Sequence, residues 1–245
     1  MANKPNRAGE GVRNALRAIF MKEFSSTEDL PPNGDIDEIA DHISKMSPEK
    51  LRLLVEQRLR GLETEVLPQL ERDEDPADIL IDCFAKYPDK LASLQDVCTE
   101  LAYAWSEQKD EEIKANPEPL GELLYMCAML HARSALPAIA HIADRANLAS
   151  AILPEGEDIQ SRALRSLAGL LVSEPPKVRD EYRKLFEVAL ETVDHAPIGL
   201  TTLTTFYPSE RDTFIAKAQI HKLEEHGEVA WVIENLDMFV ESTPD

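Results

Sequence analysis

The chain has 245 residues, a formal net charge of −20 at pH 7 and only nine glycines. All-β folds and nucleotide-binding α/β folds need glycine at tight turns and beside phosphate, so this composition argues against both. The negative charge disfavours direct contact with nucleic acids and anionic membranes, because both carry negative phosphate groups. No apolar run approaches the roughly 18 residues that a membrane span needs.

The N-terminal region, which we place at residues 1–115, is expected to begin with a basic helix over residues 9–24. Residues 1–22 contain five basic residues and one acidic residue, and apolar side chains recur at helical spacing from Val12 to Phe24. Other apolar stripes predict further helices over residues 36–43, 48–67, 79–87 and 91–105.

The C-terminal region, which we place at residues 116–245, follows a polar segment, 106–118, whose closing prolines break any helix. Ser134 is expected to cap one helix of this region, and Ser209 to begin another that ends at Gly227. The short segment 200–207 is rich in threonine, which favours a strand locally. Its leucines recur every three residues, however, and this spacing predicts a helix. The predicted helices cover residues 120–130, 136–142, 159–171, 178–193, 200–207, 209–227 and 229–239.

Three stretches of this region each consist of a helix, a short turn and a second helix: 119–147, 158–194 and 197–226. The sequence SALPAIAHIADRANL at 134–148, followed by IQSRALRSLAGLL at 159–171, resembles consecutive helices of HEAT-like repeats. The resemblance implies a scaffold or adaptor that binds proteins along the surface made by the second helix of each pair. We therefore predict an all-α fold, with antiparallel helical pairs stacked as a short HEAT-like α-solenoid or packed as a multi-helix bundle.

No motif for catalysis or metal binding is present in the sequence. The chain has no P-loop, no GxSxG elbow and no HExxH motif. His131 and His141 could meet across a turn, but a metal site there would need further ligands. Cys83, Cys98 and Cys127 stand far apart without a CxxC motif, which indicates a reducing compartment. We therefore predict a cytoplasmic protein that is not an enzyme and holds no cofactor or metal.

The second helices of the proposed pairs hold most of the basic residues outside the N-terminal arm. If these helices line one surface, that surface could contact an acidic segment of a partner; the alternative is pairing with the many nearby acids. The apolar last helix, 228–240, is a second candidate for a surface that a partner covers, although aromatic side chains such as Trp231 and Phe239 more often belong to the core. The predicted partner-binding residues are Arg133, Arg145, Arg179, Arg183, Trp231 and Phe239.

These observations predict a non-enzymatic protein–protein interaction module, such as an adaptor or the regulatory subunit of a larger complex. Its partner would be a protein, and a basic one would suit the acidic surface. A first alternative is an acidic nucleic-acid mimic or inhibitor that binds a basic protein groove. A second alternative is a helical enzyme with an unrecognised site. The sequence leaves the oligomeric state open.

Overall fold

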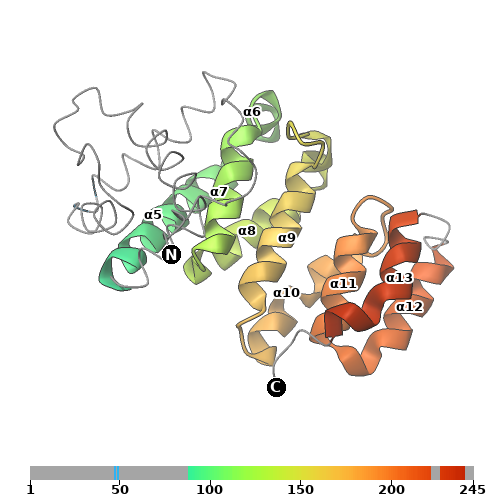
Figure 1. Ribbon diagram of the computed structural model, residues 1–245. Coiled ribbons are helices and arrows are strands. Elements are labelled where there is room, and N and C mark those ends of the chain that lie inside the picture. The colour runs from blue at the N-terminus through green and yellow to red at the C-terminus, as the bar shows by residue number, and fades with distance from the viewer. Residues whose placement is uncertain (1–46, 48, 50–87, 222–226, 241–245) are drawn as a thin grey trace, which may run out of the picture. The chain divides into compact units, whose positions relative to one another are not determined.

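A computed structural model describes residues 47, 49, 88–221 and 227–240 (Figure 1). Within these residues the chain forms nine α-helices, three short 3-10 helices and no β-strand. The predicted all-α fold is therefore confirmed. The helices that the sequence predicts before residue 88, including the basic first helix, lie outside the described residues.

The chain divides into two compact units, which we describe separately. Among the described helical residues, the first unit comprises 88–107 and 118–135, and the second comprises 108–117, 136–221 and 227–240. These units interleave along the sequence. Division into two domains at residues 115 and 116 stays a prediction.

In its described residues the first unit contains helices α5 (Pro88–Ser106) and α7 (Glu118–Met129) and the 3-10 helix η1 (Arg133–Ala135). Helix α5 packs against both α7 and η1. Cys98 and Cys127 are fully buried in this contact as free thiols. Interaction with the Cys98 side chain and burial both raise the pKa of the Cys127 thiol, which keeps it in its unreactive protonated form.

Helix α7 ends in a tight turn at His131, which has a positive φ of 52°. Beyond this turn the Ala132 amide donates to the Cys127 carbonyl at 2.9 Å, which satisfies a carbonyl at the helix terminus. The prediction that Ser134 caps the next helix is wrong. Ser134 lies inside η1, because the chain enters a 3-10 turn before the helix starts at Leu136.

The second unit begins with a short helix, α6 (Asp110–Ala115), inside the polar segment 106–118, which lies outside the predicted helices. The helix ends at Ala115, before the first of the closing prolines, as the expected break requires. Its side chains suit a short helix, since acidic residues occupy the first turn and Lys114 the last. Ile113 is fully buried and gives the helix an apolar contact.

Helices α8 (Leu136–Ala143) and α9 (Ile159–Leu171) pack against each other, and the 3-10 helix η2 (Ala146–Ser150) lies between them in sequence. The Asp158 carboxylate accepts a hydrogen bond from the Ser161 amide at 2.8 Å. This N-cap fixes the start of α9. The two helices pack together because buried apolar side chains recur along each of them.

Helices α10 (Pro176–Ala189) and α11 (Ala196–Phe206) form a second packed pair. They meet closely at Gly199, where an added Cβ would lie 2.7 Å from the Phe186 carbonyl oxygen. The prediction of helix for α11 is confirmed. Its hydroxyls fit the helix because Thr204 and Thr205 donate to carbonyls one turn earlier.

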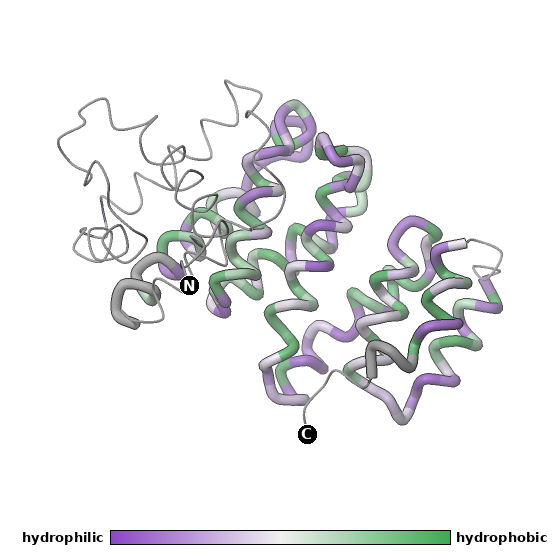
Figure 2. The backbone as a smooth tube through the Cα atoms, in the orientation of Figure 1, coloured by the Kyte–Doolittle hydropathy of each residue, from purple (hydrophilic) through white to green (hydrophobic). Residues whose placement is uncertain are grey.

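The chain continues through the 3-10 helix η3 (Pro208–Glu210) to helices α12 (Arg211–Ile220) and α13 (Gly227–Val240). Ser209 lies within η3 and α12 stops at Ile220, so the predicted single helix from Ser209 to Gly227 is wrong. Helices α12 and α13 both pack on α11. Figure 2 shows apolar positions recurring along these helices between hydrophilic ones, as amphipathic packing requires.

Candidate functional site

A groove of about 700 Å³ opens between three helices of the second unit, α9, α11 and α13. We call it the α11 groove. Its volume lies within the range of pockets that enclose sizeable ligands. Its lining is mostly apolar with a few polar groups and consists of Arg165, Ala168, Pro197, Ile198, Thr201, Thr202, Gly227, Glu228, Trp231 and Val232.

Helical periodicity explains why these residues share one space. Groove residues stand three apart on α9, at Arg165 and Ala168, and such residues lie on one face of a helix. The close approach of Gly199 to α10 fixes how α11 is turned about its axis. Ile198 and Thr201, which flank that glycine in sequence, then line the groove.

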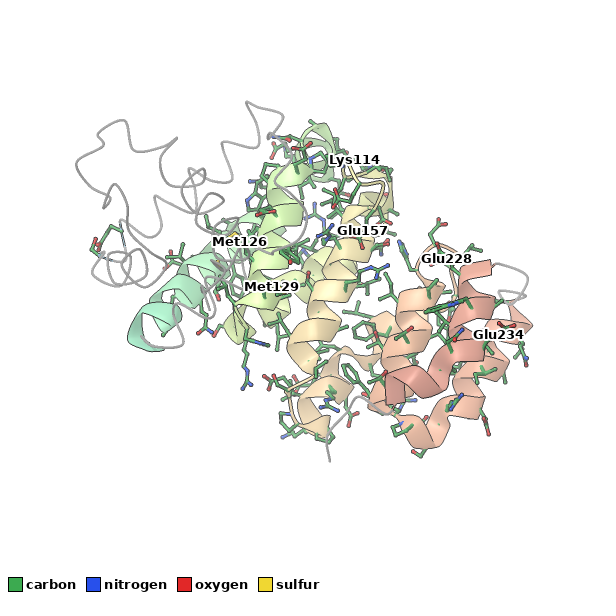
Figure 3. All side chains as sticks on the ribbon, viewed as in Figure 1. Lys114, Met126, Met129, Glu157, Glu228 and Glu234 are labelled. Carbon is green, nitrogen blue, oxygen red and sulfur yellow. The ribbon has the colours of Figure 1, made fainter. Side chains whose placement is uncertain are left out.

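Helix α13 supplies both the floor and the rim of the groove. Val232 is buried in the floor, whereas the neighbouring Trp231 is 52% exposed at the rim. Glu228 is exposed near the start of the same helix, and Figure 3 shows it with Glu234 further along. A half-exposed indole beside an apolar floor is typical of surfaces that bind a partner side chain.

The positive charge on the opposite wall of the groove is already compensated within the unit. Arg165 Nε lies 2.7 Å from a carboxylate oxygen of Glu157, and its side chain remains 65% exposed. Glu157 also pairs with Arg162 at 2.6 Å. The groove therefore combines an apolar interior with charges confined to its rim, which suits binding rather than proton transfer.

A buried polar contact joins the beginnings of two groove helices. His195, the N-cap residue of α11, is only 6% exposed, and its Nε2 lies 3.4 Å from Asp158 Oδ2 at the start of α9. Partial burial alone would raise the pKa of Asp158. Hydrogen bonds from His195 and from the Ser161 hydroxyl and amide outweigh it and lower that pKa. The Asp158–His195 pair therefore holds the ends of α9 and α11 together.

Among the predicted partner-binding residues, Arg145 lies in the second unit and holds α6 in place. Its Nε donates to Asp110 at 2.8 Å, and its terminal nitrogen donates to the Gln108 carbonyl at 2.7 Å. Hydrogen bonds from Asn147 and Arg145 lower the pKa of Asp110, which keeps the carboxylate charged. Arg145 therefore stabilises the fold by connecting its own segment to the start of α6.

Arg179 and Arg183 lie one turn apart on α10 and are the only predicted site residues that the structure brings together among those it describes. Arg179 lies 4.8 Å from the centre of the Phe206 ring and donates to the Leu171 carbonyl at 3.0 Å. Arg183 donates to both oxygens of Glu210, at 2.9 and 2.7 Å. Their guanidinium groups are therefore engaged inside the unit. Their contact with a partner stays a prediction.

The other predicted residues lie apart from this pair. Arg133 is exposed in η1 of the first unit. Trp231 lies at the rim of the α11 groove. Phe239 belongs to α13, but its side chain falls outside the described residues. Of the predicted residues, Trp231 is the one that lines the α11 groove.

Sequence reasoning missed the remaining groove residues. Ile198, Thr201 and Ala168 carry no catalytic or charged group, so nothing marks them individually. One signal was available in α11. Thr201 and Thr205 stand one turn apart and are partly exposed, as polar side chains on a helix surface usually are, whereas the other two threonines of this helix are buried.

The described residues contain no group of three or more histidine, cysteine or acidic side chains able to hold a metal ion. His131 and His141 are both exposed. In the same part of the chain, every helix is too short or too polar to cross a bilayer. The predictions on enzyme activity, cofactors and location stay predictions.

The fold and the groove define a class: an all-α protein of packed consecutive helices with an apolar surface groove. No protein-family model, no curated protein and no solved structure matches the chain. The resemblance to HEAT-like repeats, including the stacking of helical pairs as a solenoid, stays a prediction.

Proposed function

We propose that this protein is a non-enzymatic interaction module, an adaptor or regulatory subunit, and that a partner protein binds in the α11 groove. The observation that carries the proposal is the half-exposed indole of Trp231 beside a buried apolar floor. Apolar anchors that insert between helices are a common mode of peptide recognition, because they bury area that the free protein exposes to water.

The ionisable chemistry of the second unit supports binding over catalysis. The groups whose pKa values are shifted there include Asp158, Arg183 and Tyr207, and all three lie outside the groove lining. Arg183 and Tyr207 take part in contacts that hold helices together. A catalytic groove would be expected to concentrate such groups within itself.

The test is affinity capture from the lysate of the native cell with three forms of the full chain. Thr201→Phe fills the groove, whereas Thr213→Phe makes the same change at an exposed position of α12. A partner retained by wild type and Thr213→Phe but lost from Thr201→Phe is the expected result. If the Thr201→Phe variant still captures the partner, the proposal that the partner binds in the α11 groove is wrong.

The same captures, repeated with nuclease and at two salt concentrations, separate the proposal from an acidic nucleic-acid mimic. Apolar docking persists at moderate salt, whereas contacts between a basic groove and an acidic surface weaken as salt screens them. Complete loss of the partner at moderate salt would favour the mimic. Failure to capture any stoichiometric partner would contradict the interaction module.

A further inference from the structure

The exposed side of α13 places acidic groups on both sides of the groove tryptophan. Glu228, Trp231 and Glu234 stand three residues apart, and residues at this spacing lie on adjacent turns of a helix. Both glutamates are exposed (Figure 3), and Trp231, which stands between them in sequence, is 52% exposed. The rim on this side is therefore both aromatic and acidic.

The two walls of the groove differ in their charge. On the α9 wall, Arg165 lies against Glu157, so its positive charge is compensated within the unit. On the α13 side, Glu228 lines the groove and is exposed, and Glu234 is exposed further along the helix, beyond the lining. The chain as a whole carries a formal charge of −20, which attracts positively charged segments and repels negatively charged ones.

The apolar interior limits what kind of positively charged ligand fits. A floor built from Ala168, Ile198 and Val232 needs apolar groups to fill it. The indole face of Trp231 accepts a lysine or arginine side chain, because the ring face is electrostatically negative. An amphipathic helix offers both features, with apolar anchors on one face and basic residues beside them.

We propose, on the basis of the function proposed above, that the α11 groove binds a basic amphipathic helix of a partner protein. Its apolar anchors lie between α9 and α11, and a lysine or arginine lies against Trp231 and the flanking Glu228 and Glu234. The assignment rests on the apolar floor, the exposed indole and the two exposed carboxylates that flank the indole on α13.

The experiment selects ligands from a phage-displayed library of random 16-residue peptides on the immobilised full chain. Peptides that also bind the Thr201→Phe variant are discarded, so that the remaining ones depend on the groove. We expect the remaining sequences to be enriched in lysine and arginine, with bulky apolar residues at three- and four-residue spacing. Groove-dependent peptides of neutral or acidic charge would overturn this inference and leave the proposed function standing.

A selected peptide then tests the two carboxylates by calorimetry. The double variant Glu228→Gln/Glu234→Gln should bind about fivefold more weakly, as expected for the loss of two exposed charge contacts. The control Glu191→Gln/Asp212→Asn removes the same charge from exposed positions outside the groove and should bind like wild type. Equal weakening by both would overturn the assignment to Glu228 and Glu234. Selection that yields no groove-dependent peptide would contradict the proposed function as well.

Discussion

The two ends of α11 face very different surroundings. Near its start, Pro197, Ile198 and Thr201 line an open groove. At its end, Phe206 and Tyr207 lie under the arginines of α10 in a corner filled by cation–π contacts and ion pairs. The comparison teaches that the arginines of α10, which the sequence pattern singles out, stabilise the fold. The part of α11 that stays open is lined by uncharged residues that no sequence pattern singles out.

The filled corner owes its stability to contacts between helices distant in sequence. Arg183 lies 4.6 Å from the centre of the Tyr207 ring and 5.4 Å from that of Phe214, while it donates to Glu187 and Glu210. Partial burial and a hydrogen bond to a neighbouring aspartate raise the pKa of Tyr207 to about 12. These groups are held by the unit itself, so a partner would have to break existing contacts to recruit them.

Gly199 sets the close packing of α11 on α10, and its replacement should give the largest loss of unfolding free energy. Gly199→Ala brings a methyl group against the backbone of α10, and overpacking of this kind costs about 3 kcal/mol of unfolding free energy. Urea denaturation measures the loss. Gly227→Ala is the matched control, because a Cβ there meets nothing within 4 Å. Equal midpoints for the two variants would show that α10 and α11 do not approach closely at Gly199.

Removal of the Arg183 guanidinium should affect the filled corner next most strongly. Arg183→Met keeps an apolar stem but loses the ion pairs and the stacking on two rings, at a cost of about 1.5 kcal/mol. Thermal denaturation measures this loss, which should be smaller in a Glu210→Gln background because the two residues interact. Additive losses in the double variant would argue that the Arg183–Glu210 contact contributes nothing.

The Asp158–His195 pair should make the groove end of the unit sensitive to acid. The pKa of Asp158 is lowered in the folded chain, so its stabilisation is present above the unfolded value of about 3.9 and disappears as the pH falls through the folded value. Asp158→Asn keeps a helix cap but loses the charge, which should cost about 1 kcal/mol at pH 7.

Denaturation of wild type and Asp158→Asn at a series of pH values tests this link. The difference in unfolding free energy should be constant near neutral pH and should shrink below about pH 4. A difference that stays the same at pH 3 would mean that the aspartate acts through its shape and not through its charge.

The exposed charges of α13 should matter least for stability. Glu234→Gln changes an exposed side chain of α13 and should shift the unfolding free energy by less than about 0.5 kcal/mol. Chemical denaturation therefore contrasts it directly with Arg183→Met. A loss as large as that of the arginine variant would show that Glu234 has a structural task and is not simply available to a partner.

Much of the helix pattern could be predicted from local sequence. The apolar periodicity and the flanking prolines located α7, α9 and α10 correctly, because backbone hydrogen bonding within a helix depends on nearby residues. The errors lie at Ser134 and Ser209, where 3-10 turns take the place of simple caps. Local capping patterns do not distinguish these turns, since the same serines suit both.

The candidate site was much less predictable. Trp231 was found because an aromatic residue on an apolar terminal helix is a natural contact. Its neighbours in the groove that come from α9 and α11 lie 29 to 66 residues earlier in the chain. Arg183 was selected for its charge, but Glu210 is 27 residues away and no spacing rule joins the two.

The sequence by itself determined the all-α class and the positions of most described helices, because helix formation responds to local propensity, periodicity and proline. Only the tertiary structure decided which helix faces lie in the core and which arginines form ion pairs within the unit. It also decided where a groove stays open to solvent. Those outcomes depend on how helices pack against one another, and the approach of α10 and α11 at Gly199 is one such contact. Packing of this kind is a property of surfaces assembled from distant segments and is not present in any one of them.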